Sequence, residues 1–384
     1  MKPKLIYAFI LGFIGFVTSF GAHIVAVNLP SYAKEMGVGL AVIGVLIAAY
    51  DFAEIIAKPI FGVLADRQGM KRTMIAGIIL FIIASLLYLV ISPTLLILVR
   101  FLQGLGAAAL SSVSIALVAE YYSQDRGKAY GIYNAIKGAG YVLSPVIWGY
   151  IVLKSEFSNI FIATAAIGVL ALFLAFFLPK TKNDLKAELD DDDDFSIKGF
   201  IEAFRNPILL PWYLVIVINM FFVGILFGFL PIRIASLGYT PFHAGVVMSV
   251  VALSYILIQP IAGIIADKKN PLITIKIGLI LSAISVILIP FVSGIVLILI
   301  SIVSGIGVGI VWTNTDTLVS SLAKKGALGQ TVGIAGSFKE FGDMIGPLLI
   351  GLLSQAFGLT TGFVACGILG LIAFGFIMKE HTTK

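Results

Sequence analysis

The chain has 384 residues, of which 59% are hydrophobic and only 12% are charged, and its mean hydropathy is +1.08. Soluble domains average about 45–50% apolar and about 25% charged residues, so this composition excludes an ordinary water-soluble fold. The net charge of +6 would suit a nucleic acid or an acidic lipid surface, but the positions of the charges give a simpler explanation, below.

Apolar runs long enough to cross a bilayer, roughly 20 residues each, recur along the whole chain. Such long, continuous runs satisfy their backbone groups as α-helices, whereas barrel strands are short and alternate apolar with polar residues. The expected fold is an all-α integral membrane protein of twelve transmembrane helices in two six-helix bundles. We place the spans at residues 5–29, 40–64, 72–91, 94–119, 128–152, 158–178, 208–231, 241–265, 272–291, 294–319, 328–353 and 358–378.

The basic residues give the orientation of these spans. With the N-terminus in the cytoplasm, most of the 26 Lys and Arg residues fall in cytoplasmic segments, and only Lys34, Lys154 and Arg233 fall in outside loops. Both termini are therefore expected in the cytoplasm, in a multi-pass protein of the cytoplasmic (inner) membrane. The positive net charge mostly reflects this topology, so no nucleic-acid partner is expected.

One hydrophilic segment divides the chain. Residues 179–207 contain the acidic run from Asp190 to Asp194, which favours a solvated linker over a metal or regulatory site. The expected domains are an N-terminal bundle at 1–178, this linker, and a C-terminal bundle at 208–384.

The two halves are related in sequence. A shift of 201 residues aligns Pro30 with Pro231 and Pro59 with Pro260, and a shift of 202 aligns Lys137 with Lys339. Parallel repeats of this kind are expected where two rigid halves rock about a central binding site.

Three motifs carry a family resemblance. The loop after the second span resembles the signature loop of the major facilitator superfamily, in Gly62, Asp66, Arg67, Gly69, Lys71 and Arg72. Its glycines are expected to permit a tight turn, and Asp66 to cap the next helix or pair with Arg67 or Arg72. The resemblance implies a gating latch, and a topology-setting basic turn is the compatible structural interpretation. Glu120, at the inner end of the fourth span, is expected to pair with this loop in the outward-open state.

In the fourth span, Arg100 and the following Gln103-Gly-Leu-Gly resemble a second family signature, whose arginine is implied in proton coupling. A buried arginine should face the interior and have a partner, and structural pairing alone remains open. The fifth span resembles the signature of the drug:proton antiporter branch, which implies export, although Ser144 and Trp148 replace two family glycines. The physical prediction is a kinked helix with a glycine face suited to sliding on the opposite half, built from Gly131, Gly140 and Pro145, and in the eleventh span from Gly342, Gly346 and Pro347.

Ionisable residues within spans are functional candidates. Glu54 and Lys58 are expected to pair at i,i+4, as are Lys339 and Asp343. One interpretation is a structural network of ion pairs, and the other is that a carboxylate titrates during transport. The proton-coupling candidates are Asp51, Glu54, Arg100, Glu340 and Asp343, with Asp51 first and Glu340 second.

Further polar residues are expected along the path of a substrate. Asp316 is expected at the membrane interface. In the family, the first, fourth, seventh and tenth spans line the cavity, and buried cations would suit an anionic or zwitterionic compound. The candidate contacts are Asn28, Gln103, Lys137, Asn219, Trp312, Asn314 and Lys339.

The function expected from these features is proton-coupled export of a small organic or amphipathic compound by a monomer, as in efflux and multidrug resistance. A proton-coupled importer of an organic anion or metabolite, a lipid flippase and a non-transporting receptor remain alternatives. The sequence has no P-loop and its few His and Cys residues are scattered, so neither an enzyme nor a cofactor or metal site is expected.

Overall fold

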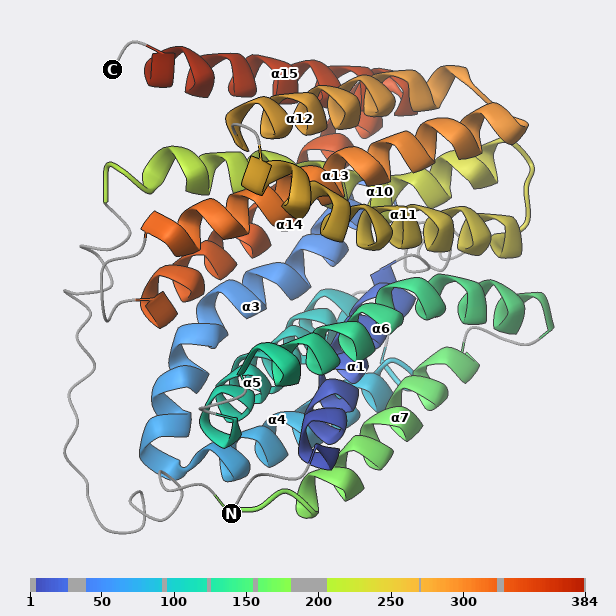
Figure 1. Cartoon of the computed structure of the whole chain (residues 1–384). Helices are drawn as coiled ribbons and strands as arrows, with labels where there is room; N and C mark the ends of the chain where they lie inside the picture. The colour runs from blue at the N-terminus through green and yellow to red at the C-terminus, as the bar shows by residue number, and fades with distance from the viewer. Residues whose placement is uncertain are drawn as a thin grey trace. The chain divides into compact units, whose positions relative to one another are not determined.

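The computed structural model describes residues 5–26, 39–91, 95–122, 126–154, 158–180, 206–268, 271–322 and 328–382 (Figure 1). These residues form twelve long α-helices and one short 3-10 helix, without a strand among them. Nine of the described helices hold an apolar stretch long enough to cross a membrane, and Leu359–Gly375 is a shorter one. The expected all-α membrane fold is confirmed, while a full set of twelve crossings stays a prediction.

The helices group into two compact units. The first unit contains most of α3 (Leu40–Gln68). Its other helices are α1 (Ile6–Ala26), α4 (Met70–Leu87), α5 (Leu96–Tyr121), α6 (Arg126–Lys154) and α7 (Ser158–Phe176). The second unit is built from α10 (Leu210–Ser236), α11 (Pro241–Lys268), α12 (Pro271–Leu288), η2 (Ile289–Phe291), α13 (Gly294–Leu322), α14 (Leu328–Phe357) and α15 (Leu359–Thr382).

Helix α3 is continuous from Leu40 to Gln68 and contributes to both units, because residues up to Ala48 group with the second unit. Within the second unit this first part of α3 approaches α14 closely. A Cβ atom added to Gly44 would lie 3.1 Å from the carbonyl carbon of Pro347, and one added to Gly351 would lie 3.0 Å from the carbonyl oxygen of Leu40. Glycine at both positions therefore permits near contact of the two backbones.

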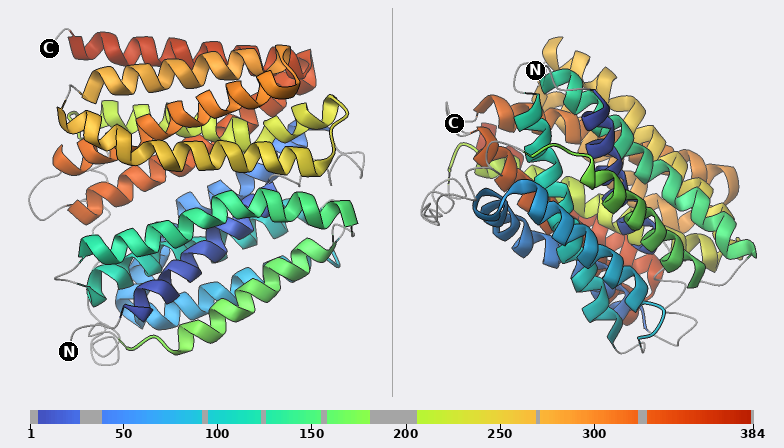
Figure 2. Two further views of the ribbon diagram at one scale, coloured as in Figure 1. Left: turned by 45° about the vertical axis from the view of Figure 1, so that its right-hand side comes forward. Right: turned by 90° about the horizontal axis from the view of Figure 1, so that it is seen from below.

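The two units repeat the same helix pairings. In the first unit α1 packs on α6, and α4 packs on both α5 and α7; in the second α10 packs on α14, and α12 packs on both α13 and α15 (Figure 2). These pairs correspond under the sequence repeat, so equivalent helices pack in equivalent ways.

Large apolar side chains are exposed on many helices. Phe173 is 58% exposed, Ile284 45% and Leu299 54%. Polar side chains also lie in the interior among apolar ones, and Ser114, Gln103 and Asn314 are fully buried there. Lipid, rather than water, is the solvent that suits such a surface, because apolar side chains gain nothing by turning inward there.

The turn after α3 differs from the prediction. The helix continues through Gly62 to Gln68, and Gly69 alone makes the turn, with a φ angle of 95°. Gly62 is therefore a helical residue, and the prediction that it helps form the tight turn is wrong. Residues other than glycine rarely adopt the φ angle of Gly69. This single glycine therefore makes the turn between α3 and α4.

Candidate functional site

In the first unit, Arg100 of α5 lies in the interior with only 2% of its surface exposed. Its Nη1 donates a hydrogen bond to Oε1 of Gln103 at 2.9 Å, and its Nη2 donates to the carbonyl oxygen of Ala22 at 3.4 Å. The guanidinium lies over the ring of Tyr50, 4.3 Å from the ring centre. The prediction of an inward-facing arginine with partners is confirmed, and the partners are neutral.

Gln103 organises this cluster. Its Oε1 also accepts from the hydroxyl of Tyr88 at 3.2 Å, and its Nε2 donates to Oγ of Ser85 at 3.5 Å. Gln103 is fully buried, and its hydrogen bonds fix the position of the Arg100 guanidinium. Within the described residues Arg100 forms no ion pair, and its buried Nε has no hydrogen-bond partner. A buried cation with spare donor capacity is costly, and this favours a functional role.

Glu54 and Lys58 of α3 form the predicted i,i+4 ion pair, with 3.4 Å between Nζ and Oε1. Ser111 of α5 also donates a hydrogen bond to Oε1 of Glu54, at 3.4 Å. Asp51 lies one turn earlier on α3 and is 7% exposed. Glu54 is thus held by one partner on its own helix and one on α5.

In the second unit, Lys339 of α14 pairs with Asp316 of α13. Its Nζ lies 2.8 Å from both carboxylate oxygens of Asp316. The predicted pair of Lys339 with Asp343 is wrong, and the packing gives the reason. Asp343 lies against α10, where a Cβ atom on Gly224 would be 2.9 Å from its Oδ1, while Lys339 reaches toward α13.

Aromatic rings adjoin this ion pair. The Nζ of Lys339 lies 5.1 Å from the ring centre of Trp312, and Trp312 stacks on Tyr255 of α11 with a centroid distance of 5.9 Å and an interplanar angle of 11°. The structure thereby brings together two of the predicted substrate contacts, Trp312 and Lys339.

The predicted asparagine contacts are buried in the same unit. Nδ2 of Asn219 donates to the carbonyl of Val308 at 3.3 Å, and Nδ2 of Asn314 donates to that of Ile310 at 2.7 Å. The Oδ1 atom of each is buried without a hydrogen-bond partner among the described residues. Such acceptors are rarely left unsatisfied, so they are candidate contacts for a ligand.

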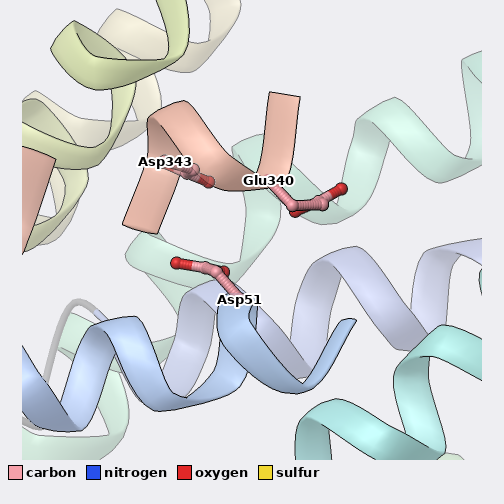
Figure 3. A group of neighbouring side chains, drawn as sticks. All are labelled: Asp51, Glu340 and Asp343. Atoms are coloured by element: carbon pink, nitrogen blue, oxygen red, sulfur yellow. The ribbon is translucent and has the colours of Figure 1, made fainter. Parts of the chain in front are cut away.

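The remaining coupling candidates are divided between the units. Figure 3 draws Asp51 on α3 and Glu340 and Asp343 on α14. Lys137 of α6 is half-buried, and within the described residues its side chain has no ion pair. Its repeat equivalent Lys339 pairs with Asp316. In the part of the chain that the structure describes, the two equivalent lysines therefore differ in having a carboxylate partner.

The signature loop has a structural role in the first unit. Nζ of Lys71 donates to the carbonyl oxygens of Phe176 and Leu178, at 2.8 and 2.5 Å, and so caps the end of α7. Arg72 is exposed, and Glu120 is half-buried in the last turn of α5. The pairing of Glu120 with the loop stays a prediction. Asn28, the linker residues 181–205 and the side chains of Asp66 and Arg67 lie outside what the structure describes.

The glycines of the kink motifs pack inside their own units. A Cβ atom on Gly140 of α6 would lie 2.9 Å from the backbone nitrogen of Phe20 in α1. In α14, Gly342 and Gly346 approach the backbone of α10 in the same manner. Gly140, Gly342 and Gly346 thus serve close packing within their own units, and sliding on the opposite half stays a prediction. Both α6 and α14 remain helical through Pro145 and Pro347, and Gly131 lies in α6.

Sequence reasoning missed several contacts. Tyr50 lies under Arg100, Tyr88 donates to Gln103, and Tyr255 stacks on Trp312. Each of these tyrosines belongs to an apolar run and to another helix or turn than its partner. The only available signal was that a buried cation commonly lies over an aromatic ring, which does not identify the ring.

These units of apolar helices, with charged side chains held inside them, define a polytopic membrane protein. The family model described as Major Facilitator Superfamily matches residues 11–342 and 212–383. The chain therefore belongs to the Major Facilitator Superfamily, a family of transporters rather than of enzymes.

Relatives and solved structures agree with this assignment. Riboflavin transporter RibZ of Clostridioides difficile (strain 630) is 29% identical over 204 residues, which are 52% of this chain and 44% of the relative. Quinolone resistance protein NorA of Staphylococcus aureus (strain Mu50 / ATCC 700699) is 30% identical over 172 residues, 44% of each chain. The matched stretch is thus under half of each relative's length.

The fold resembles that of solved transporters. A bacterial homolog to the human lysosomal transporter Spinster has a TM-score of 0.82 at 15% identity, covering 98% of this chain and 97% of that one. The nucleoside transporter NupG (D323A mutant) has a TM-score of 0.81 at 15% identity, covering 98% and 99%. Identity this low supports the fold alone.

Proposed function

We propose that this protein is a proton-coupled antiporter that exports a small organic or amphipathic compound from the cytoplasm by alternating access. It acts as a monomer in the cytoplasmic (inner) membrane, with both termini in the cytoplasm. The observation that carries the proposal is a set of charged side chains inside apolar helices, above all Arg100 at 2% exposure and Asp51 and Glu54 at 7%. Charged groups within membrane-spanning helices are energetically costly, and where they occur they mark functional sites such as those of transport.

Two further observations support export. The fifth span resembles the signature of the drug:proton antiporter branch in Gly131, Gly140 and Pro145. The relative NorA is named for quinolone resistance, a property that export of the compound would confer. In this scheme Asp51 and Glu340 are the first candidates to exchange a proton, and Arg100 adjusts the charge balance of the first unit.

A second candidate function is proton-coupled import of an organic anion or metabolite. The cations Arg100, Lys137 and Lys339 favour it, as does the relative RibZ, whose name gives riboflavin as its substrate. The two functions differ in the sign of the coupling. A substrate that competes with a proton drives antiport, whereas one that binds together with a proton drives symport.

Proton release on binding tests this sign. A thermal-shift screen of anionic, zwitterionic and cationic compounds, with riboflavin and a quinolone among them, first identifies a ligand for the purified protein. Adding that ligand in weak buffer with a pH indicator should release protons from the wild type, and release should diminish in Asp51→Asn or Glu340→Gln. Proton uptake would favour the importer, and undiminished release in both variants would show that the proton is carried elsewhere.

A further inference from the structure

The ammonium group of Lys339 occupies two recognition elements at once. It contacts both carboxylate oxygens of Asp316 at 2.8 Å, and it lies 5.1 Å from the ring centre of Trp312, whose ring stacks on Tyr255. A carboxylate beside an aromatic face is the combination that binds an ammonium ion. Lys339 thus fills a site built for a cation, with a charge tethered to the protein.

The ion pair is accessible to a ligand. The side chain of Asp316 is 41% exposed and that of Lys339 is 21% exposed, although both lie on predominantly apolar helices. An ion pair this exposed adds little to the packing of α13 on α14, because solvent weakens the attraction of its charges. Partial exposure leaves room for its charges to exchange partners.

The repeat separates this pair from the shared helical scaffold. Lys339 has an equivalent in the first half, Lys137, at the shift of 202 residues. At the shift of 201 that aligns Gly104 with Gly305, Asp316 falls on Ile115 and Trp312 falls on Ser111. The cation is present in both halves, whereas the carboxylate and the ring occur only in the second, as expected for a specific site.

Charge pairing selects the class of ligand. A simple organic cation that displaced Lys339 from Asp316 would take the counter-ion from the lysine, and a simple anion that captured Lys339 would take the ammonium of Lys339 from Asp316. Breaking an ion pair between apolar helices by removing one partner is costly. A zwitterion avoids both costs, because its ammonium replaces that of Lys339 and its carboxylate pairs with the released lysine.

We propose that Lys339, Asp316, Trp312 and Tyr255 form a binding site for a zwitterionic compound that carries an aromatic ring, hereafter the zwitterion site. The ammonium of the ligand binds Asp316 over the face of Trp312, its carboxylate binds Lys339, and its ring extends the Trp312–Tyr255 stack. The inference rests on the proposed function, since it assumes that the chain carries a small organic compound, and it names the class of that compound.

Three probes that differ only in charge test the site. Phenylalanine carries both charges, phenethylamine lacks the carboxylate, and 3-phenylpropanoate lacks the amine. The chain has three tryptophans, so Trp148→Phe with Trp212→Phe leaves Trp312 as the reporter of binding by fluorescence, in full-length protein in lipid nanodiscs. Phenylalanine should bind at least about tenfold more tightly than either analogue, because each analogue breaks the pair of Lys339 and Asp316 and replaces only one of its two charges.

Charge variants should reverse this order. In Lys339→Met the carboxylate of Asp316 no longer pairs with Lys339 and should select phenethylamine, and in Asp316→Asn the ammonium of Lys339 no longer pairs with Asp316 and should select 3-phenylpropanoate. Lys276→Met, on α12 of the same unit, is the matched control and should keep the wild-type order. The order is read within each variant, so a partial loss of folded protein does not change it.

Several results would overturn the zwitterion site. They are equal binding of an analogue and phenylalanine to the wild type, an unchanged order in both charge variants, or no effect of any probe on Trp312 fluorescence. Binding is measured at equilibrium without a gradient. A failure here therefore leaves the export proposal standing, and a failure of export leaves the site standing.

Discussion

Two glycines of α14 provide a matched test of close packing within the second unit. A Cβ atom on Gly342 would lie 2.8 Å from Cβ of Met220 and 2.9 Å from Cα of Val217, and closer still to the carbonyl oxygen of Val217. A Cβ atom on Gly336, less than two turns earlier, would meet nothing within 4 Å. Alanine at the two positions should therefore have opposite effects on stability.

The magnitudes follow from the two environments. Replacing Gly336 by alanine lowers the entropy of the unfolded chain and should raise the free energy of unfolding by about 0.5–1 kcal/mol. Replacing Gly342 by alanine forces α14 away from α10, and overpacking of this kind costs about 1–3 kcal/mol. The two variants should thus differ by about 1.5–4 kcal/mol.

Unfolding in mixed micelles by titration with SDS, followed by the loss of helical circular dichroism, measures this difference. Gly336→Ala serves as the control, because it makes the same chemical change on the same helix. A Gly342→Ala protein that is as stable as Gly336→Ala would refute the conclusion that Gly342 is packed against α10.

Two further predictions concern the first unit. Gln103→Leu leaves two buried donors, on Arg100 and Tyr88, without their acceptor, and should lower the free energy of unfolding by about 2–6 kcal/mol. Tyr88→Phe removes only one of those donors and should lower it by about 1 kcal/mol or less in the same SDS titration. Equal losses in the two variants would contradict this role of Gln103. Lys71→Met removes the cap on α7, so amide hydrogen exchange should become faster in the last turn of that helix. Lys71→Arg should retain most of the protection from exchange. Unchanged exchange in Lys71→Met would show that the cap does not stabilise the helix end.

Much of the fold could be predicted from local sequence properties. Long apolar runs fix helices in lipid, and an arginine such as Arg100 must turn inward because the alternative is exposure to hydrocarbon. The ion pair of Glu54 and Lys58 was also predictable, because helical geometry brings residues four apart onto one face.

The same spacing rule failed for Lys339, and the reason is tertiary. Its i,i+4 neighbour Asp343 packs against α10, so the flexible lysine reaches Asp316 on α13, a contact that only the packing of helices defines. The glycines of α14 pose a similar limit. A sequence shows that Gly342 permits close approach, but it does not name the helix that approaches.

The most direct test of the account is the direction of coupled transport. Inside-out vesicles that contain the protein are given an acidic lumen and a fluorescent ligand from the thermal-shift screen. The ligand is added outside in one set and preloaded into the lumen in a second set, with Asp51→Asn vesicles and a proton ionophore as controls. Export by proton antiport predicts that the ligand accumulates in the lumen as protons leave, and that the ionophore abolishes this accumulation. Loss of preloaded ligand from the lumen together with the protons, without accumulation, would contradict export and establish a symporter directed into the cytoplasm.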